Sequence, residues 1–181
     1  MPTLYVVATP IGNLGDMSPR AIETLRSVQL IAAEDTRVTM KLLNAFDIST
    51  PLTSCHEHNE RSKAVQIAER MLAENIDVAV TTDAGTPCIS DPGSVLVREA
   101  TERGIPVVAV SGPTAMASAL SVSGMDISEF TFYGFLPRQK NELREKLTDM
   151  ARHSKIAVVH ESPHRVIELL QQVQAVLPHT Y

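Results

Sequence analysis

The sequence lacks any hydrophobic run long enough to span a membrane. The longest apolar stretches, such as residues 105–110, are far too short to cross a bilayer, and this one contains a proline. No charged and then apolar leader precedes the first strand-like segment. The two cysteines, Cys55 and Cys88, have neither metal-binding nor redox spacing. We therefore expect a cytoplasmic protein with ordinary thiols and no membrane partner.

The familiar nucleotide and metal motifs are missing as well. The sequence contains neither G-x-x-x-x-G-K-[ST] nor G-x-G-x-x-G, which excludes a P-loop and a dinucleotide fingerprint. Without the P-loop lysine, phosphoryl transfer on a nucleotide is not expected. His56 and His58 stand two residues apart instead of the four of a helical zinc site, so no metal site is predicted.

An overall excess of basic residues is also absent. The chain has 16 Lys and Arg against 21 Asp and Glu, and its net charge of −5 argues against a globally basic nucleic-acid binder. The charge is unevenly spread, because residues 1–130 carry 9 basic and 16 acidic side chains, whereas residues 131–165 carry 7 and 4. The later segment is either a solvated helix face or a local surface for an anionic ligand.

Short apolar runs alternate with helical patterns along the 181 residues. Runs at 4–8, 30–33, 51–54, 76–81 and 105–110 predict strands, each followed by a helix. Five such units predict an α/β fold whose first domain is a parallel five-stranded sheet with helices on both faces. After Gly124, strand-like segments at 130–136 and 155–160 alternate with two more helical patterns. The predicted domains are residues 1–124 and the start of a second α/β domain, residues 125–181.

Polar or Gly/Pro-rich loops follow the five predicted strands. In an open parallel sheet, ligands bind beyond the carboxyl ends of the strands, so these loops mark the expected site. They cover residues 9–14, 34–37, 55–59, 82–87 and 111–115. Each could also be a simple strand-to-helix turn. The connection at 83–93 is unusually long, and long ordered connections are usually functional.

Several loops resemble one family. The blocks, in chain order, are Thr9-Pro-Ile-Gly-Asn-Leu14, Ala33-Glu-Asp-Thr-Arg37, Asp83-Ala-Gly-Thr-Pro87, Asp91-Pro-Gly93, Ser111-Gly-Pro113, Gly134-Phe-Leu-Pro137 and Glu161-Ser-Pro-His-Arg165. Over essentially the whole chain they resemble the ribosomal RNA small-subunit methyltransferase I family, within the tetrapyrrole (corrin/porphyrin) methylase superfamily. The resemblance implies two α/β domains, S-adenosyl-L-methionine as methyl donor and 2′-O-methylation of a cytidine in small-subunit ribosomal RNA. It also implies the 30S subunit as partner and a homodimer.

The resemblance further implies roles for individual residues. The cofactor would contact Asp83, Ala84, Gly85, Thr86, Pro87, Ile89, Ser111, Gly112, Pro113, Thr114, Ala115, Phe135 and Leu136. The substrate would face Pro10, Gly12, Asn13, His58, Arg138 and His164. A ribose hydroxyl is a poor acid, so a base or a polarising cation would help the reaction. Asp35, Arg37, Glu161 and Arg165 are the catalytic candidates, and the sequence leaves the choice of base open among Asp35, His58, Glu161 and His164.

Plainer interpretations remain for these candidates. Asp35 and Arg37 could form only a salt bridge, and Glu161 could only favour the start of a helix. The basic segment 131–165, with Arg138, Lys140, Arg144 and Lys146, would provide a surface for the RNA backbone.

Length is the main departure from the family pattern. The family's chains continue beyond a segment like 156–177, so we expect an incomplete second domain, weakened cofactor binding and little catalysis. Three alternatives remain open: a methyltransferase acting on a tetrapyrrole such as a precorrin, a non-catalytic RNA-binding fragment, and magnesium-dependent nucleotide hydrolysis by the acidic loop residues.

Overall fold

The computed structural model describes residues 1–177, which form two compact units. The first unit is Met1–Ala115, and the second begins at Met116. This division falls at the start of α5 (Ala115–Ser121), earlier in the chain than the boundary at 124/125 expected from composition. The last four residues assigned to the expected second domain lie outside the described residues. None of the helices within residues 1–177 has the length and apolar character needed to cross a membrane.

A five-stranded parallel sheet forms the centre of the first unit. Its strands are β1 (Leu4–Val7), β2 (Leu30–Ala33), β3 (Leu52–Ser54), β4 (Val78–Thr81) and β5 (Val107–Val110), in the order β3-β2-β4-β1-β5. Every residue of β2 and of β4 is buried. Continuous burial is typical of strands covered on both faces, and it explains the unbroken apolar runs of the sequence. The predicted parallel five-stranded sheet is confirmed.

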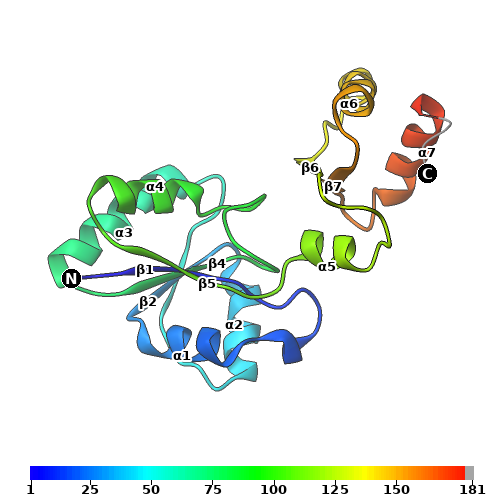
Figure 1. Cartoon of the computed structure of the whole chain (residues 1–181). Coiled ribbons are helices and arrows are strands. Elements are labelled where there is room, and N and C mark those ends of the chain that lie inside the picture. Colours follow the sequence, from blue (N-terminus) through cyan, green and yellow to red (C-terminus); the bar gives the residue numbers. More distant parts are fainter. Residues whose placement is uncertain (178–181) are drawn as a thin grey trace. The chain divides into compact units, whose positions relative to one another are not determined.

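Helices cover both faces of this sheet, as predicted (Figure 1). Helices α1 (Pro19–Ser27) and α2 (Thr36–Ala45) lie on one face, and α3 (Glu60–Glu74) and α4 (Ser94–Glu102) lie on the other. Each face has its own hydrophobic cluster. Leu25 and Leu43 are fully buried on the α1/α2 side, and Met71 and Leu96 are fully buried on the α3/α4 side. Burying each such side chain stabilises the fold by roughly 1.5–3 kcal/mol.

The chain crosses the sheet in two directions, which locates the site. It runs from β1 through α1 and α2 to the edge strand β3, and then returns through α3, β4 and α4 to the opposite edge at β5. Neighbouring strands β1 and β4 therefore send their helices to opposite faces, which opens a crevice at their carboxyl ends. Two backbone hydrogen bonds between Thr9 and Gly85, of 2.9 and 3.0 Å, join the loops that leave these strands.

Local capping fixes where the first two helices begin. The Ser18 hydroxyl accepts the Ala21 amide at 3.1 Å, and Pro19 takes the first helical position of α1. The Asp35 carboxylate caps α2 by accepting the Arg37 amide at 2.8 Å. The first turns of α2 are thereby held at the carboxyl edge of the sheet.

The second unit continues from α5 with β6 (Thr131–Phe135), α6 (Lys140–His153), β7 (Ala157–His160) and α7 (Val166–Val176). β6 and β7 pair in parallel as a two-stranded sheet, in the two segments where strands were predicted. A pair of strands is marginally stable alone. Its support is a cluster of buried side chains from the end of β6 and from α6 and α7: Leu136, Leu143, Leu147, Met150 and Leu169.

Candidate functional site

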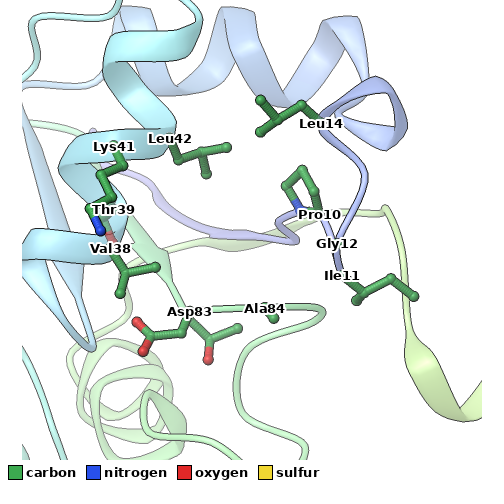
Figure 2. Close-up of a pocket in the computed structure, with 11 residues that line it drawn as sticks. Pro10, Ile11, Gly12, Leu14, Val38, Thr39, Lys41, Leu42, Asp83 and Ala84 are labelled. Atoms are coloured by element: carbon green, nitrogen blue, oxygen red, sulfur yellow. The ribbon is translucent and has the colours of Figure 1, made fainter.

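A pocket of about 460 Å³ lies beside the crevice of the first unit (Figure 2). The loop after β1, the first turns of α2 and the loop after β4 form its walls, and Leu14 and Leu42 face each other across it. Its volume falls within the range of small-molecule sites. The lining residues are Pro10, Ile11, Gly12, Leu14, Val38, Thr39, Lys41, Leu42, Thr82, Asp83 and Ala84. Of the predicted site residues, the structure thus brings Pro10, Gly12, Asp83 and Ala84 together here.

One buried hydroxyl in the pocket wall has no partner. Thr39 is only 2% exposed, and its Oγ1 makes no hydrogen bond within residues 1–177. An unsatisfied buried polar group costs roughly 1–3 kcal/mol. The hydroxyl is itself shielded from solvent, so this cost belongs to the fold and the group is not offered to a ligand in the pocket.

Reciprocal hydrogen bonds hold the loops after β2 and β4 together. The Glu34 carboxylate accepts the Thr82 hydroxyl at 2.6 Å and the Asp83 amide at 3.2 Å. In return, the Asp83 carboxylate accepts the Asp35 amide at 3.2 Å. Since these bonds run in both directions between the two loops, they fix the position of the Asp83 carboxylate at the edge of the pocket (Figure 2).

The surroundings of Asp83 are acidic. Partial burial, followed by the charges of Glu34, Asp35 and Asp91, raises the pKa of the Asp83 carboxyl above its ordinary value. A negative potential that disfavours ionisation of Asp83 also stabilises a cation placed beside it. This edge of the pocket therefore suits a positively charged ligand group, such as an ammonium or a sulfonium.

Asp35 and Arg37 form the salt bridge that the sequence offered as an alternative. The Arg37 guanidinium donates to the two Asp35 carboxylate oxygens at 3.0 and 2.6 Å. This hydrogen bonding lowers the pKa of Asp35 to about 2, so its carboxylate is a weak base at neutral pH. The Arg37 side chain is 87% exposed, so it is open to an anionic group from solvent.

The glycine loops of the first unit fit the expected cofactor. The Thr86 hydroxyl donates to the Pro113 carbonyl at 3.2 Å and links the loops after β4 and β5. Gly85 has φ +90°, a conformation that favours glycine, and a Cβ on Gly112 would lie only 3.0 Å from the Ala8 Cβ. The exposed backbone at 111–112, together with the acidic Asp83, offers both hydrogen bonds and charge complementarity to a sulfonium-bearing amino acid.

The predicted cofactor residues outside these loops lie in different surroundings. Ile89 and Phe135 are each 57% exposed. Leu136 is 5% exposed and packs in the core of the second unit.

The catalytic candidates of the second unit lie at the start of α7. The Glu161 carboxylate accepts the Ser162 amide at 2.7 Å and pairs with Arg165 at 3.4 Å. His164 is exposed. Arg138 and Arg165 line one small cavity between α6 and α7.

The remaining predicted substrate residues lie outside the pocket. The Asn13 side chain accepts the Gly15 amide at 3.0 Å and caps the short helix η1 (Leu14–Asp16). His58 is exposed, and its ring stands edge-on to that of His56 with centroids 6.0 Å apart.

Sequence reasoning missed two contributions to the site. Val38 and Leu42 stand four residues apart on α2, a spacing that indicates one helix face, but nothing in the sequence directed that face to the pocket. Glu60 is 8% exposed, and its Oε1 accepts the amides of Gly93 at 2.6 Å and Val95 at 3.0 Å. It thereby anchors the end of the 83–93 connection, with partners 33 and 35 positions away that no local pattern reveals.

Comparison with curated proteins found relatives that match nearly the whole chain. Three of them are each named "Ribosomal RNA small subunit methyltransferase I". The relative from Vibrio cholerae is 47% identical over 176 residues, 97% of this chain and 61% of its own length. That from Pseudomonas aeruginosa is 48% identical over 174 residues, 96% and 61%. That from Bacillus subtilis is 46% identical over 177 residues, 98% and 60%. The chain thus spans about three fifths of the length of the relatives it matches.

Comparison with solved structures and family models identifies the fold. The crystal structure of uroporphyrin-III-C-methyltransferase from Thermus thermophilus matches with a TM-score of 0.58 and 17% identity, over 82% of this chain and 74% of that one. At this identity the likeness shows a common fold alone. The model of the tetrapyrrole (corrin/porphyrin) methylases matches residues 3–180. As the resemblance of its loops predicted, the chain belongs to the tetrapyrrole (corrin/porphyrin) methylase family.

Proposed function

We propose that this chain carries the donor and acceptor sites of an S-adenosyl-L-methionine-dependent ribosomal RNA methyltransferase. The observation that carries the proposal is the 460 Å³ pocket beside the acidic Asp83 and the glycine loops. The names of relatives at 46–48% identity support RNA as the acceptor. We further propose that the acceptor is a cytidine 2′-hydroxyl of small-subunit RNA in the 30S subunit, modified in the cytoplasm by a homodimer.

The donor site uses the loops after β4 and β5. Bound S-adenosyl-L-methionine supplies an electrophilic methyl group on a sulfonium. The backbone at 83–87 and 111–115 would hold it, with Ile89 as a further contact. Asp83 contributes the negative charge, and glycine at 85 and 112 permits the positive φ of the first loop and the close packing of the second against Ala8.

The acceptor site is the pocket itself. Its volume accommodates a nucleobase, and its apolar walls replace the stacking that a base loses when it leaves its RNA neighbours. The exposed Lys41 side chain supplies a hydrogen-bonding group for the base edge. Holding the base fixes the attached ribose, and this alignment supplies much of the acceleration of an in-line displacement.

The charged candidates take different roles in this proposal. Because the pKa of Asp35 is about 2, Asp35 is better suited to orient Arg37 than to remove a proton. Arg37 then stabilises the developing oxyanion or an adjacent phosphate. Glu161, paired with Arg165, remains a candidate base, as do His58 and His164.

Donor binding and methyl transfer test the proposal separately. Isothermal titration calorimetry with S-adenosylhomocysteine measures the donor site, and tritiated S-adenosyl-L-methionine with unmethylated 30S subunits measures transfer. We expect micromolar donor binding and slow transfer by this chain. The variant Lys41→Met, which removes the ammonium group and keeps the length of the side chain, should leave S-adenosylhomocysteine affinity unchanged and raise KM for the RNA. Absence of heat at high micromolar ligand contradicts the donor site, and transfer to a tetrapyrrole in place of RNA contradicts the acceptor.

A further inference from the structure

A second cavity lies within the second unit, between the starts of α6 and α7. Its volume is about 60 Å³, which corresponds to roughly four to six water-sized positions and so to a group the size of a phosphate. Three cationic side chains line it: Arg138 and Lys140 at the start of α6, and Arg165 at the start of α7. Leu143, Glu168, Leu169 and Gln172 complete the wall.

The cations of this cavity are incompletely neutralised. Arg138 and Lys140 form no ion pair within residues 1–177, whereas Lys146, farther along α6, pairs with Asp149 at 3.7 Å and lies over the Tyr133 ring at 4.8 Å. Some of the basic side chains of residues 131–165 therefore pair with acidic or aromatic groups of the same unit. Within residues 1–177, Arg138 and Lys140 at this cavity do not form such ion pairs.

Acidic groups reduce the positive charge here without cancelling it. Arg165 pairs with Glu161 at 3.4 Å, and Glu168 lines the cavity. Three cations thus face two carboxylates. Neither α6 nor α7 has a side-chain N-cap hydrogen bond, so the first turn of each helix keeps positive potential at its amide groups. Guanidinium groups with neighbouring amides match an oxyanion that has several oxygens.

We propose that this cavity binds one phosphate group of the RNA backbone. Arg138 and Lys140 supply the main charge, Arg165 approaches from α7, and Gln172 offers an amide donor. The assignment to RNA rests on the proposed function, whereas the affinity for phosphate as a chemical group does not. A phosphate held on the second unit fixes the position of the RNA strand without reading its sequence.

Inorganic phosphate is the first probe. ¹H–¹⁵N spectra of the whole chain are recorded during a phosphate titration at constant ionic strength. We expect saturable shifts of the amides near Arg138, Lys140 and Arg165, which disappear in the double variant Arg138→Gln/Lys140→Gln. The matched control Arg144→Gln removes an exposed cation of the same helix that does not line the cavity, and it should leave the shifts intact. Absence of local shifts up to tens of millimolar phosphate overturns the site.

A labelled fragment of small-subunit ribosomal RNA is the second probe. We expect the double variant to weaken RNA binding about tenfold and to reduce the salt dependence by about one phosphate contact. The control Arg20→Gln, which removes an exposed cation of the first unit, should have a much smaller effect. Equal RNA affinity of the double variant and the wild type overturns the assignment to RNA. Local phosphate binding without any RNA binding supports the anion site and contradicts the proposed function, so the two failures are distinguishable. Circular dichroism of each variant confirms that the fold is intact.

Discussion

Glu60 offers a sharp test of how the fold positions the donor loop. Its buried carboxylate on α3 accepts two amides at the start of α4, from Gly93 and Val95, and both donate to the same oxygen, Oε1. Gly93, the N-cap residue of α4, has no side chain to cap the helix. The carboxylate of Glu60 therefore substitutes for a capping residue and closes the far end of the 83–93 connection.

The two hydrogen bonds set the expected magnitude. A hydrogen bond to a charged group contributes roughly 1.5–3 kcal/mol, so Glu60→Ala, which leaves two amides unpaired, should lower the free energy of unfolding by about 3–5 kcal/mol. Glu60→Gln keeps an oxygen at the Oε1 position and should cost only about 1–2 kcal/mol. The exposed neighbour Glu57 is the matched control, and Glu57→Ala should stay within about 0.5 kcal/mol of the wild type.

Urea unfolding followed by circular dichroism measures these differences, and calorimetry with S-adenosylhomocysteine measures the donor loop. We expect the affinity for S-adenosylhomocysteine to fall in the same order as the stability. If Glu60→Ala unfolds within 0.5 kcal/mol of the wild type, as expected of the Glu57 control, the capping role is refuted. If stability falls but S-adenosylhomocysteine affinity does not, Glu60 is structural only.

Three further predictions concern the loops around the site. Gly85→Ala should cost about 1–2 kcal/mol of stability and weaken S-adenosylhomocysteine binding, whereas Gly104→Ala, at φ +71° with no atom within 4 Å of its Cβ, should lose similar stability and bind normally. Because folding raises the pKa of Asp83, its ionised form destabilises the native state above the unfolded pKa, and this cost disappears as the pH falls and the group is protonated. Asp83→Asn should therefore raise the urea midpoint of unfolding at pH 7, and this gain should shrink toward pH 4. The same variant should weaken binding of cationic S-adenosylmethionine more than binding of S-adenosylhomocysteine, whose sulfur is uncharged. Burial and the charge of Glu60 raise the pKa of Cys55 and Cys88 to about 11, so Ellman's reagent should react slowly with both at pH 8 until the chain is unfolded; rapid labelling of the native chain contradicts this.

The fold was predictable from the sequence because its signals are local. A strand buried on both faces needs an unbroken apolar run, which 30–33 and 78–81 supply, and a parallel pair of strands needs a helix between them. Several strands begin one or two positions later in the structure than predicted. The predicted strand at 76–81 begins at Val78, because the Ile76 amide still bonds to the Met71 carbonyl at the end of α3.

The site was predictable only in outline. The loop blocks located the carboxyl edge of the sheet, and the structure confirms that the loops after β1 and β4 meet there. The hydrogen bonds from the Thr82 hydroxyl to Glu34 and from the Asp35 amide to Asp83 join residues 48 positions apart, so no periodicity could reveal them.

The charge of the chain has a physical reason in the proposed chemistry. A sulfonium-bearing donor is a cation, and the first unit provides Asp83, whose pKa is raised by burial and by the neighbouring carboxylates. An RNA strand is a polyanion, and the second unit provides Arg138 and Lys140, which form no ion pair within residues 1–177. Each reactant would therefore be attracted by one unit and repelled by the other. A net charge of −5 describes neither surface. Raising the salt concentration should therefore weaken RNA binding steeply and weaken binding of cationic S-adenosyl-L-methionine more than that of S-adenosylhomocysteine, whose sulfur is uncharged. Parallel titrations from about 50 to 300 mM salt measure these differences. Equal salt dependence for S-adenosyl-L-methionine and S-adenosylhomocysteine refutes the attraction of the donor to the first unit, and salt-independent RNA binding refutes that of RNA to the second.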